Sequence, residues 1–80
     1  MRKSIHDEPY VAQREALKAA RKAAGLNQEA VAERLERPQS YVAKYETGDR
    51  RLDVVEFIEV CRAIGADPAA ILKLVQATLA

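Results

Sequence analysis

Apolar residues recur at three- and four-residue intervals along most of the 80-residue chain, with polar residues between them. This spacing gives an α-helix one apolar face, whereas a half-buried strand would alternate at every second residue. The clearest case is residues 54–64, where the apolar repeat consists of Val54, Phe57, Ile58, Cys61 and Ile64. The pattern predicts an all-α chain in which this helix makes the largest contribution to the core.

Residues that start and stop helices divide the chain into predicted segments. We expect helices over residues 9–24, 28–35, 39–47, 54–64 and about 68–79. Three of them are preceded by side chains that can accept a backbone N–H of the first turn, namely Asn27, Asp53 and Asp67. Because 80 residues bury only one core, we predict a tail over residues 1–8 and one compact five-helix bundle over residues 9–80.

Two of these helices, residues 28–35 and 39–47, are short and separated by a tight break. Pro38 suits the first turn of the later helix, and it disfavours α conformation at the preceding residue, which keeps the two helices from fusing. In the later helix we expect Val42 to face inward together with Tyr45 or Glu46. Such a pair of amphipathic helices is typical of a protein that places the second helix in a DNA groove.

Three stretches of sequence carry a resemblance to a known family. They are RKAAGLNQ at 21–28, AERL at 32–35 and QSYVAKYETGDRRLDVVEF at 39–57. Over residues 17–72 the chain resembles the Cro/Xre phage-repressor family, which implies a phage-repressor-type bundle with a helix-turn-helix formed by the second and third helices. Glu36 departs from the family pattern, since a glycine usually stands there, and Arg37 replaces a residue that tends to be aliphatic. We therefore expect slight strain in the turn.

The resemblance implies a DNA-reading surface on the helix over residues 39–47. Its base-contacting positions match Gln39, Ser40, Ala43 and Lys44. Gln39 suits an adenine edge, Lys44 a guanine, and Ala43 the methyl group of thymine. The alternative interpretation of these residues is an ordinary helix face exposed to water.

Five residues are predicted to contact DNA phosphates: Arg21, Gln28, Tyr41, Arg50 and Arg51. Gln28 stands at a helix N-terminus, where free backbone N–H groups favour an anion. We expect Tyr41 to be exposed, so that its hydroxyl can donate to a phosphate, and Tyr45 to lie in the core. For Arg51 the alternative is a local ion pair with Asp49 or Asp53.

The resemblance also implies an ion pair between Arg21 of the first helix and Glu46 of the third. A planar guanidinium can hold a carboxylate and still present further donors to a phosphate. The alternative is an exposed ion pair that contributes at most about 1 kcal/mol to stability.

The helix over residues 68–79 has more apolar surface than one side of a small core requires. Its apolar residues are Ile71, Leu72, Leu74, Val75 and Leu79. We predict that they form a homodimer surface, to which Val55 and Val60 add, although they could instead cap the core. A two-fold dimer would place its recognition helices about 34 Å apart, which predicts a palindromic operator.

Charge and composition limit the possible functions. The net charge is only +1, but residues 1–22 carry six basic and three acidic residues, whereas residues 53–80 carry two and four. This asymmetry can orient the basic end towards phosphates. Cys61 is the only cysteine and His6 the only histidine, so we expect no disulfide, no metal site and no cofactor. We also expect a cytoplasmic chain without a membrane span, and no enzymatic activity, because no catalytic residue set is visible.

Together these features predict a sequence-specific regulator of transcription that binds double-stranded DNA, namely a repressor. Two alternatives stay open: an antitoxin whose partner is a toxin or another regulatory protein, and a protein-interaction adaptor with the same fold. The low net charge is the best support for the adaptor.

Overall fold

The computed structural model describes residues 8–79, and within this range the regular structure is helical. The helices are α1 (Glu8–Ala23), α2 (Gln28–Leu35), α3 (Gln39–Thr47), α4 (Val54–Ile64) and α5 (Pro68–Ala77). The predicted all-α, five-helix fold is confirmed, with α1 displaced by one residue and α5 ending two residues early. The predicted tail residues 1–7, with His6, lie outside the described residues, as does residue 80.

The predicted capping residues start the helices as expected. Asn27 Oδ1 accepts a hydrogen bond from the Ala30 N–H at 2.8 Å, and Asp67 Oδ1 accepts one from the Ala69 N–H at 3.0 Å. Asp53 Oδ1 accepts the N–H of Glu56 at 2.7 Å. Each cap satisfies a backbone donor that has no partner inside its own helix, which fixes where the helix begins.

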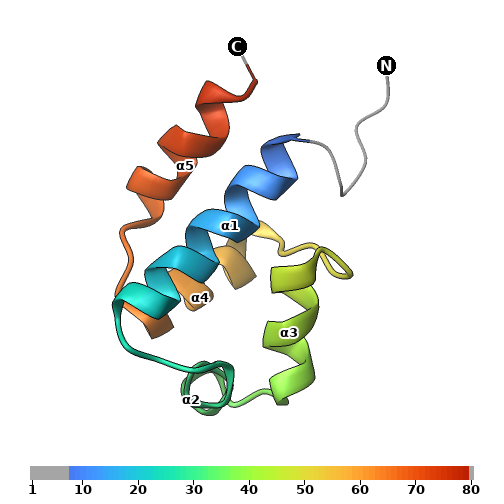
Figure 1. Ribbon diagram of the computed structural model, residues 1–80, viewed down its shortest axis with the longest axis vertical. Helices are drawn as coiled ribbons and strands as arrows, with labels where there is room; N and C mark the ends of the chain where they lie inside the picture. The colour runs from blue at the N-terminus through green and yellow to red at the C-terminus, as the bar shows by residue number, and fades with distance from the viewer. Residues whose placement is uncertain (1–7, 80) are drawn as a thin grey trace.

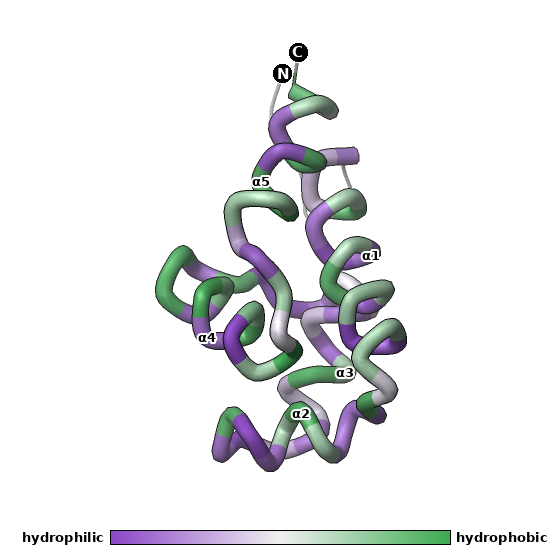
Figure 2. Tube along the Cα trace, turned by 90° about the vertical axis from the view of Figure 1, so that its left-hand side faces the viewer, coloured by the Kyte–Doolittle hydropathy of each residue, from purple (hydrophilic) through white to green (hydrophobic). Residues whose placement is uncertain are grey.

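The helices form a bundle in which the helix-turn-helix occupies one end. Helix α1 runs diagonally across the molecule, with α5 beside it and α4 behind it, while α2 and α3 lie at the lower end (Figure 1). The side view in Figure 2 shows the same order, with α4 on the opposite side of the molecule from α1. Helix α2 packs on α3 and α4, and α1 packs on α3, α4 and α5. Helix α3 is therefore held from behind by two other helices.

One hydrophobic core joins all five helices. Its buried members are Leu17, Val31, Ala32, Tyr41, Val42, Tyr45, Phe57, Val60, Cys61, Ile64 and Ile71. Cys61 is fully buried, as expected for a cysteine that packs as a small hydrophobic residue, and burial raises the pKa of its thiol to about 11.

The buried face of α4 is rotated relative to the sequence prediction. Val54 and Ile58 were expected in the core but are 73% and 39% exposed, whereas Val60, expected on the surface, is fully buried. The stripe that packs inward runs through Phe57, Val60, Cys61 and Ile64. Ile58 falls at the edge of this stripe, and Val54 lies in the first turn, where no neighbouring helix covers it.

The turn between α2 and α3 contains the backbone strain that the sequence predicts. Glu36 ends α2 in the left-handed region, with φ 55° and ψ 44°. No other non-glycine residue among those described has a positive φ. Its N–H closes the helix on the Ala32 and Glu33 carbonyls. The Cβ of an L-residue makes this conformation unfavourable, so the strain is a cost of the Glu36 side chain.

We predict that Glu36→Gly raises the free energy of unfolding by about 1 kcal/mol, because glycine adopts this conformation without a Cβ clash. Urea unfolding measures the change. The matched control is Glu33→Gly, an exposed position inside the same helix, where glycine should instead lower stability by about 1 kcal/mol. Equal losses at both positions would contradict a strained turn.

Candidate nucleic-acid interface

Helix α3 turns one polar face to solvent and buries the other. Gln39, Ser40 and Lys44 are exposed and Ala43 is half-buried, so the predicted base-contacting residues share the outer side. The inner side buries Tyr41, Val42, Tyr45 and Glu46. Both Tyr45 and Glu46 face inward, which the sequence pattern left as alternatives.

The predicted pair of Arg21 and Glu46 is present and buried. Arg21 Nε donates to Glu46 Oε2 at 2.6 Å and Arg21 Nη2 donates to Oε1 at 3.1 Å, so the contact is bidentate. Only 9% of the Arg21 side chain and 3% of the Glu46 side chain are exposed. The hydrogen bond to Glu46 raises the pKa of Arg21, against the opposing effect of burial. An exposed, weak ion pair is therefore the wrong description of this contact.

Gln28 extends the pair into a network that reaches the outer face of α3. Its Nε2 donates to Glu46 Oε1 at 3.0 Å, and Gln39 Nε2 donates a long hydrogen bond of 3.5 Å to Gln28 Oε1. Arg21 Nη1 also donates to the Leu26 carbonyl at 2.9 Å. These bonds link α1, the start of α2, and both faces of α3, and they fix the orientation of the Gln28 amide.

Tyr41 is buried, contrary to the prediction from the sequence. It was expected to be exposed, but only 7% of the residue is accessible. Tyr41 lies one turn before Tyr45 on the same inward face of α3, and the two rings meet edge to face at 5.7 Å. The guanidinium groups of Arg37 and Arg50 lie 4.6 and 4.7 Å from the Tyr41 ring centre, and burial raises the pKa of its phenol. These neighbours cover the ring that was expected to face DNA.

Arg50 is also held by partners within the protein. Its Nη1 and Nη2 donate to Glu56 Oε1 and Oε2 at 3.1 and 2.7 Å, and Nη1 donates to the Arg51 carbonyl at 3.0 Å. The Arg50 hydrogen bonds, followed by the one from the Asp53 N–H, lower the pKa of Glu56 from 4.5 to about 2. A lowered pKa means that the pair stabilises the fold above pH 4.5 and loses this contribution as the pH falls towards 2.

Glu56 was not among the predicted site residues, although the sequence contains a signal for it. Asp53 and Glu56 stand three residues apart, which is the spacing of a capping box. In the structure Glu56 Oε1 accepts the Asp53 N–H at 3.0 Å, while Asp53 accepts the Glu56 N–H. The same carboxylate therefore caps α4 and binds Arg50.

Arg51 is exposed beside the same loop. Its guanidinium lies 4.5 Å from the centre of the Tyr10 ring. Within residues 8–79 it forms no ion pair, so neither Asp49 nor Asp53 makes the local pair considered as the alternative. Among the described residues, its charge is not neutralised by a carboxylate contact.

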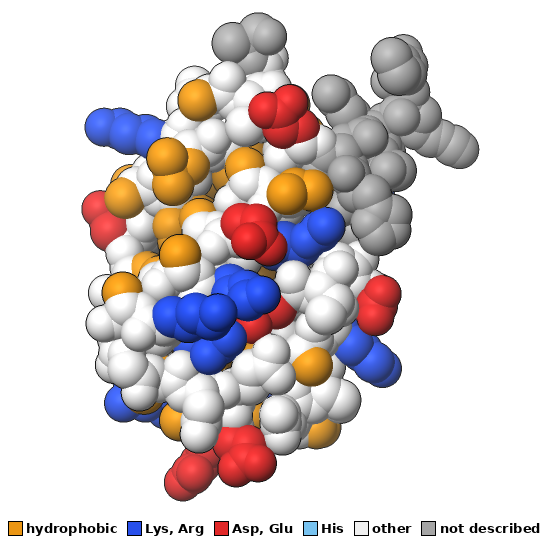
Figure 3. All heavy atoms as spheres, viewed as in Figure 1, with side chains coloured by type: hydrophobic (Ala, Val, Ile, Leu, Met, Phe, Trp, Pro, Cys, Tyr) orange, Lys and Arg blue, Asp and Glu red, His pale blue; other side chains and the backbone are white. Residues whose placement is uncertain are grey.

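The apolar surface of α5 is smaller than predicted. Leu72, Leu74 and Leu79 are 52%, 56% and 59% exposed, and Val75 is half-buried, but Ile71 is 5% exposed and belongs to the core. Ile71 faces inward because α5 packs along α1. Hydrophobic side chains gather at the upper left of Figure 3, where α1 and α5 lie side by side.

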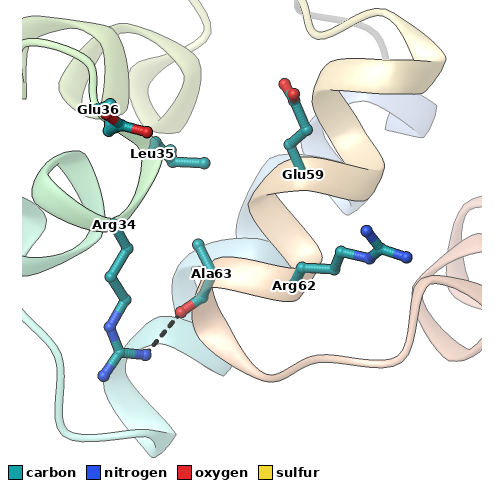
Figure 4. Close-up of a pocket in the computed structure, with 6 residues that line it drawn as sticks. All are labelled: Arg34, Leu35, Glu36, Glu59, Arg62 and Ala63. Atoms are coloured by element: carbon teal, nitrogen blue, oxygen red, sulfur yellow. Dashed lines mark hydrogen bonds between the residues drawn. The ribbon is translucent and has the colours of Figure 1, made fainter.

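Two hollows lie outside the α3 surface. A groove of about 250 Å³ between α1 and α5 is lined by Pro9, Tyr10, Gln13, Leu52, Leu72, Val75 and Leu79. A second hollow, of about 450 Å³, lies between the end of α2 and α4, where Arg34 donates to the Ala63 carbonyl at 2.8 Å (Figure 4). Its charged side chains, Arg34, Glu36, Glu59 and Arg62, do not converge on one point.

The described residues offer no metal site and no membrane span. Residues 8–79 contain no group of three or more His, Cys, Asp or Glu side chains that could hold a metal ion. None of the helices in this range has the length and apolar character needed to cross a bilayer.

We predict that Arg21→Ala lowers the free energy of unfolding by about 3 kcal/mol, because it leaves the Glu46 carboxylate buried without its cation. Urea unfolding measures the loss. Lys22→Ala is the matched control, since Lys22 is the exposed neighbour in the last turn of α1. An Arg21 variant as stable as the Lys22 variant would show that the pair contributes little.

Comparisons with known proteins agree with this architecture. Residues 14–74 match the family described as helix-turn-helix domain. A solved XRE-family like protein from Pseudomonas syringae pv. tomato str. DC3000 is 49% identical over 95% of this chain and 93% of that chain, with a TM-score of 0.85. The clp gene regulator ClgR from C. glutamicum shares the fold, with a TM-score of 0.80 and 24% identity over 94% of this chain and 97% of that chain. No curated protein matches the chain. The chain therefore belongs to the helix-turn-helix family, as a DNA-binding transcription regulator of the XRE type.

Proposed function

We propose that the protein is a sequence-specific repressor that places α3 in the major groove of double-stranded DNA. The observation that carries this proposal is the outer face of α3, which presents Gln39, Ser40, Ala43 and Lys44. Gln39 is hydrogen-bonded to Gln28, which in turn binds the buried Glu46. A helix in the major groove reads bases with the residues near its N-terminus. These four positions begin at the first residue of α3.

The contact with Gln28 suits Gln39 for reading adenine. One Nε2 proton of Gln39 points to Gln28 Oε1. The second Nε2 proton and the side-chain oxygen Oε1 of Gln39 remain available for a base. Adenine offers one acceptor and one donor in the major groove, so a glutamine held in this way matches it with two hydrogen bonds. Lys44 is exposed for a guanine, and the half-buried Ala43 lies on the same side of α3 for the methyl group of thymine.

Phosphate contacts are assigned to the two ends of the motif. Gln28 and the free N–H groups at the start of α2 form one contact, and Arg51 in the loop after α3 forms the other. Arg21 is buried, so we assign it an indirect role in which it holds Glu46 and through it Gln28. The burial of Tyr41 argues against a direct phosphate contact.

We predict that Lys44→Ala lowers affinity for a duplex selected from a random pool by about ten-fold, because it removes one base contact. Lys73→Ala is the matched control: Lys73 is an exposed lysine on α5, outside the α3 surface. Fluorescence anisotropy at constant salt measures both. Equal affinities for the two variants would contradict a base-reading role for α3.

A protein-interaction adaptor is the second candidate, because the net charge is only +1 and apolar side chains remain exposed. An adaptor would bind no duplex from the random pool with sequence preference. The antitoxin alternative keeps the DNA-binding surface and adds a toxin as partner. Both alternatives place the chain in the cytoplasm, as does the repressor.

We propose that a homodimer supplies the affinity that one weakly charged copy lacks. Leu72 and Leu79 line the groove between α1 and α5 and are more than half exposed, so they are the candidate contact residues. A dimer doubles the number of neutralised phosphates, which steepens the salt dependence of binding.

We predict that the wild type sediments as a dimer at micromolar concentration and that the double substitution Leu72→Ser, Leu79→Ser shifts it to monomer. Val54→Ser, at an exposed apolar residue of α4 that lies outside the groove and the predicted dimer surface, is the control. A wild type that sediments only as a monomer would contradict the dimer proposal and leave the DNA-binding proposal standing.

A further inference from the structure

We propose that Arg50 and Glu56 are a positioning pair that orders the loop between α3 and α4, so that Arg51 rather than Arg50 supplies the loop's phosphate contact. This inference rests on the proposed DNA-binding function. It separates two adjacent arginines that the sequence presents as equivalent.

The contacts of Arg50 leave it few donors for a ligand. Both terminal nitrogens donate to the Glu56 carboxylate, and one also donates to the Arg51 carbonyl. The Cζ atom of the guanidinium lies over the Tyr41 ring, 4.7 Å from the ring centre. A phosphate could take these donors only by displacing Glu56, whose side chain is 14% exposed.

Both ends of the loop are fixed. At the α3 end the N–H groups of Gly48, Asp49 and Arg50 all point to the Lys44 carbonyl, at 3.1, 2.9 and 3.2 Å. At the α4 end the Asp53 N–H donates to Glu56. The Arg50 guanidinium connects the two ends because it binds the Glu56 carboxylate and also the Arg51 carbonyl in the middle of the loop.

The same contacts connect the loop to the turn of the helix-turn-helix. Tyr41 contacts Arg50 with its ring, and the guanidinium of Arg37 lies over that ring as well. Arg37 belongs to the turn between α2 and α3. The turn, α3 and the following loop are therefore connected through contacts with the Tyr41 ring, and Glu56 binds Arg50 on the α4 side.

The electrostatic consequence distinguishes the two arginines. The charge of Arg50 is compensated by a carboxylate at 2.7 Å, whereas Arg51 makes no such contact within residues 8–79. Neutralising a phosphate releases counterions, and only a cation that binds the phosphate adds to the salt dependence of affinity. Arg51 should therefore contribute to the slope of log affinity against log salt, and Arg50 should not.

The decisive variant is Glu56→Gln, which keeps an oxygen to accept the Asp53 N–H but removes the charge that holds Arg50. Loss of a negative charge near DNA would by itself strengthen binding. If the pair positions the loop, the variant instead binds about ten-fold more weakly, because the loop must then be ordered on binding and ordering even one residue costs conformational entropy. Glu59→Gln is the matched control, since it makes the same charge change on the exposed face of α4.

Two further variants test the division of roles by anisotropy at several salt concentrations. Arg51→Ala should reduce the slope of log affinity against log salt by about 0.9 per lost phosphate. Arg50→Lys keeps the charge but loses the bidentate hydrogen bonds to Glu56 and the guanidinium contact with the Tyr41 ring, so it should weaken binding at every salt concentration with an unchanged slope.

A third variant, Arg50→Ala, should leave the slope of log affinity against log salt unchanged. Tighter binding by Glu56→Gln, or a slope reduced as much in Arg50→Ala as in Arg51→Ala, would overturn the inference while leaving the proposed function intact. Thermal melts of each variant confirm that binding is measured on folded protein. A wild type that binds no selected duplex would overturn the proposed function, and this inference with it.

Discussion

The surface proposed to face DNA depends on one buried contact, the bidentate pair between Arg21 of α1 and Glu46 of α3. Moving both charges out of water is costly, and their attraction offsets that cost only when the remaining donors and acceptors are satisfied. Here Leu26 and Gln28 provide the additional hydrogen bonds, and no buried side-chain polar atom in the described residues lacks a partner. The pair therefore fixes the rotation of α3 about its axis, and with it the residues that α3 presents outward.

Local signals in the sequence predicted the parts of the fold that depend on local chemistry. Asn27, Asp53 and Asp67 begin their helices because a side-chain cap needs only its own first turn. The periodicity of one helix could not show where the neighbouring helices would cover it, which is why Val60 and Ile71 are buried against expectation. For the candidate site, the exposed face of α3 and the Arg21–Glu46 pair were predicted, the latter through the family resemblance.

The charges are consistent with the proposed selective recognition of DNA by a nearly neutral chain. Arg21 and Arg50 are both compensated by carboxylates, so they shape the surface more than they attract phosphates. The exposed cations on α3 and in the loop after it include Lys44 and Arg51. A small number of free charges keeps non-specific affinity low, because that affinity comes from phosphate neutralisation. In the proposed function, sequence preference depends on the geometry of α3, and a second copy of the chain would supply the missing affinity.

The most direct test of this dependence replaces the pair with apolar side chains of similar size, in the double variant Arg21→Met, Glu46→Leu. Apolar replacement of a buried ion pair often preserves stability, so the fold can be kept while the hydrogen bond to Gln28 is lost. We expect a melting temperature close to that of the wild type and an affinity for the selected duplex that is lower by about ten-fold. A stable double variant that binds the duplex as tightly as the wild type would contradict the central role of the pair.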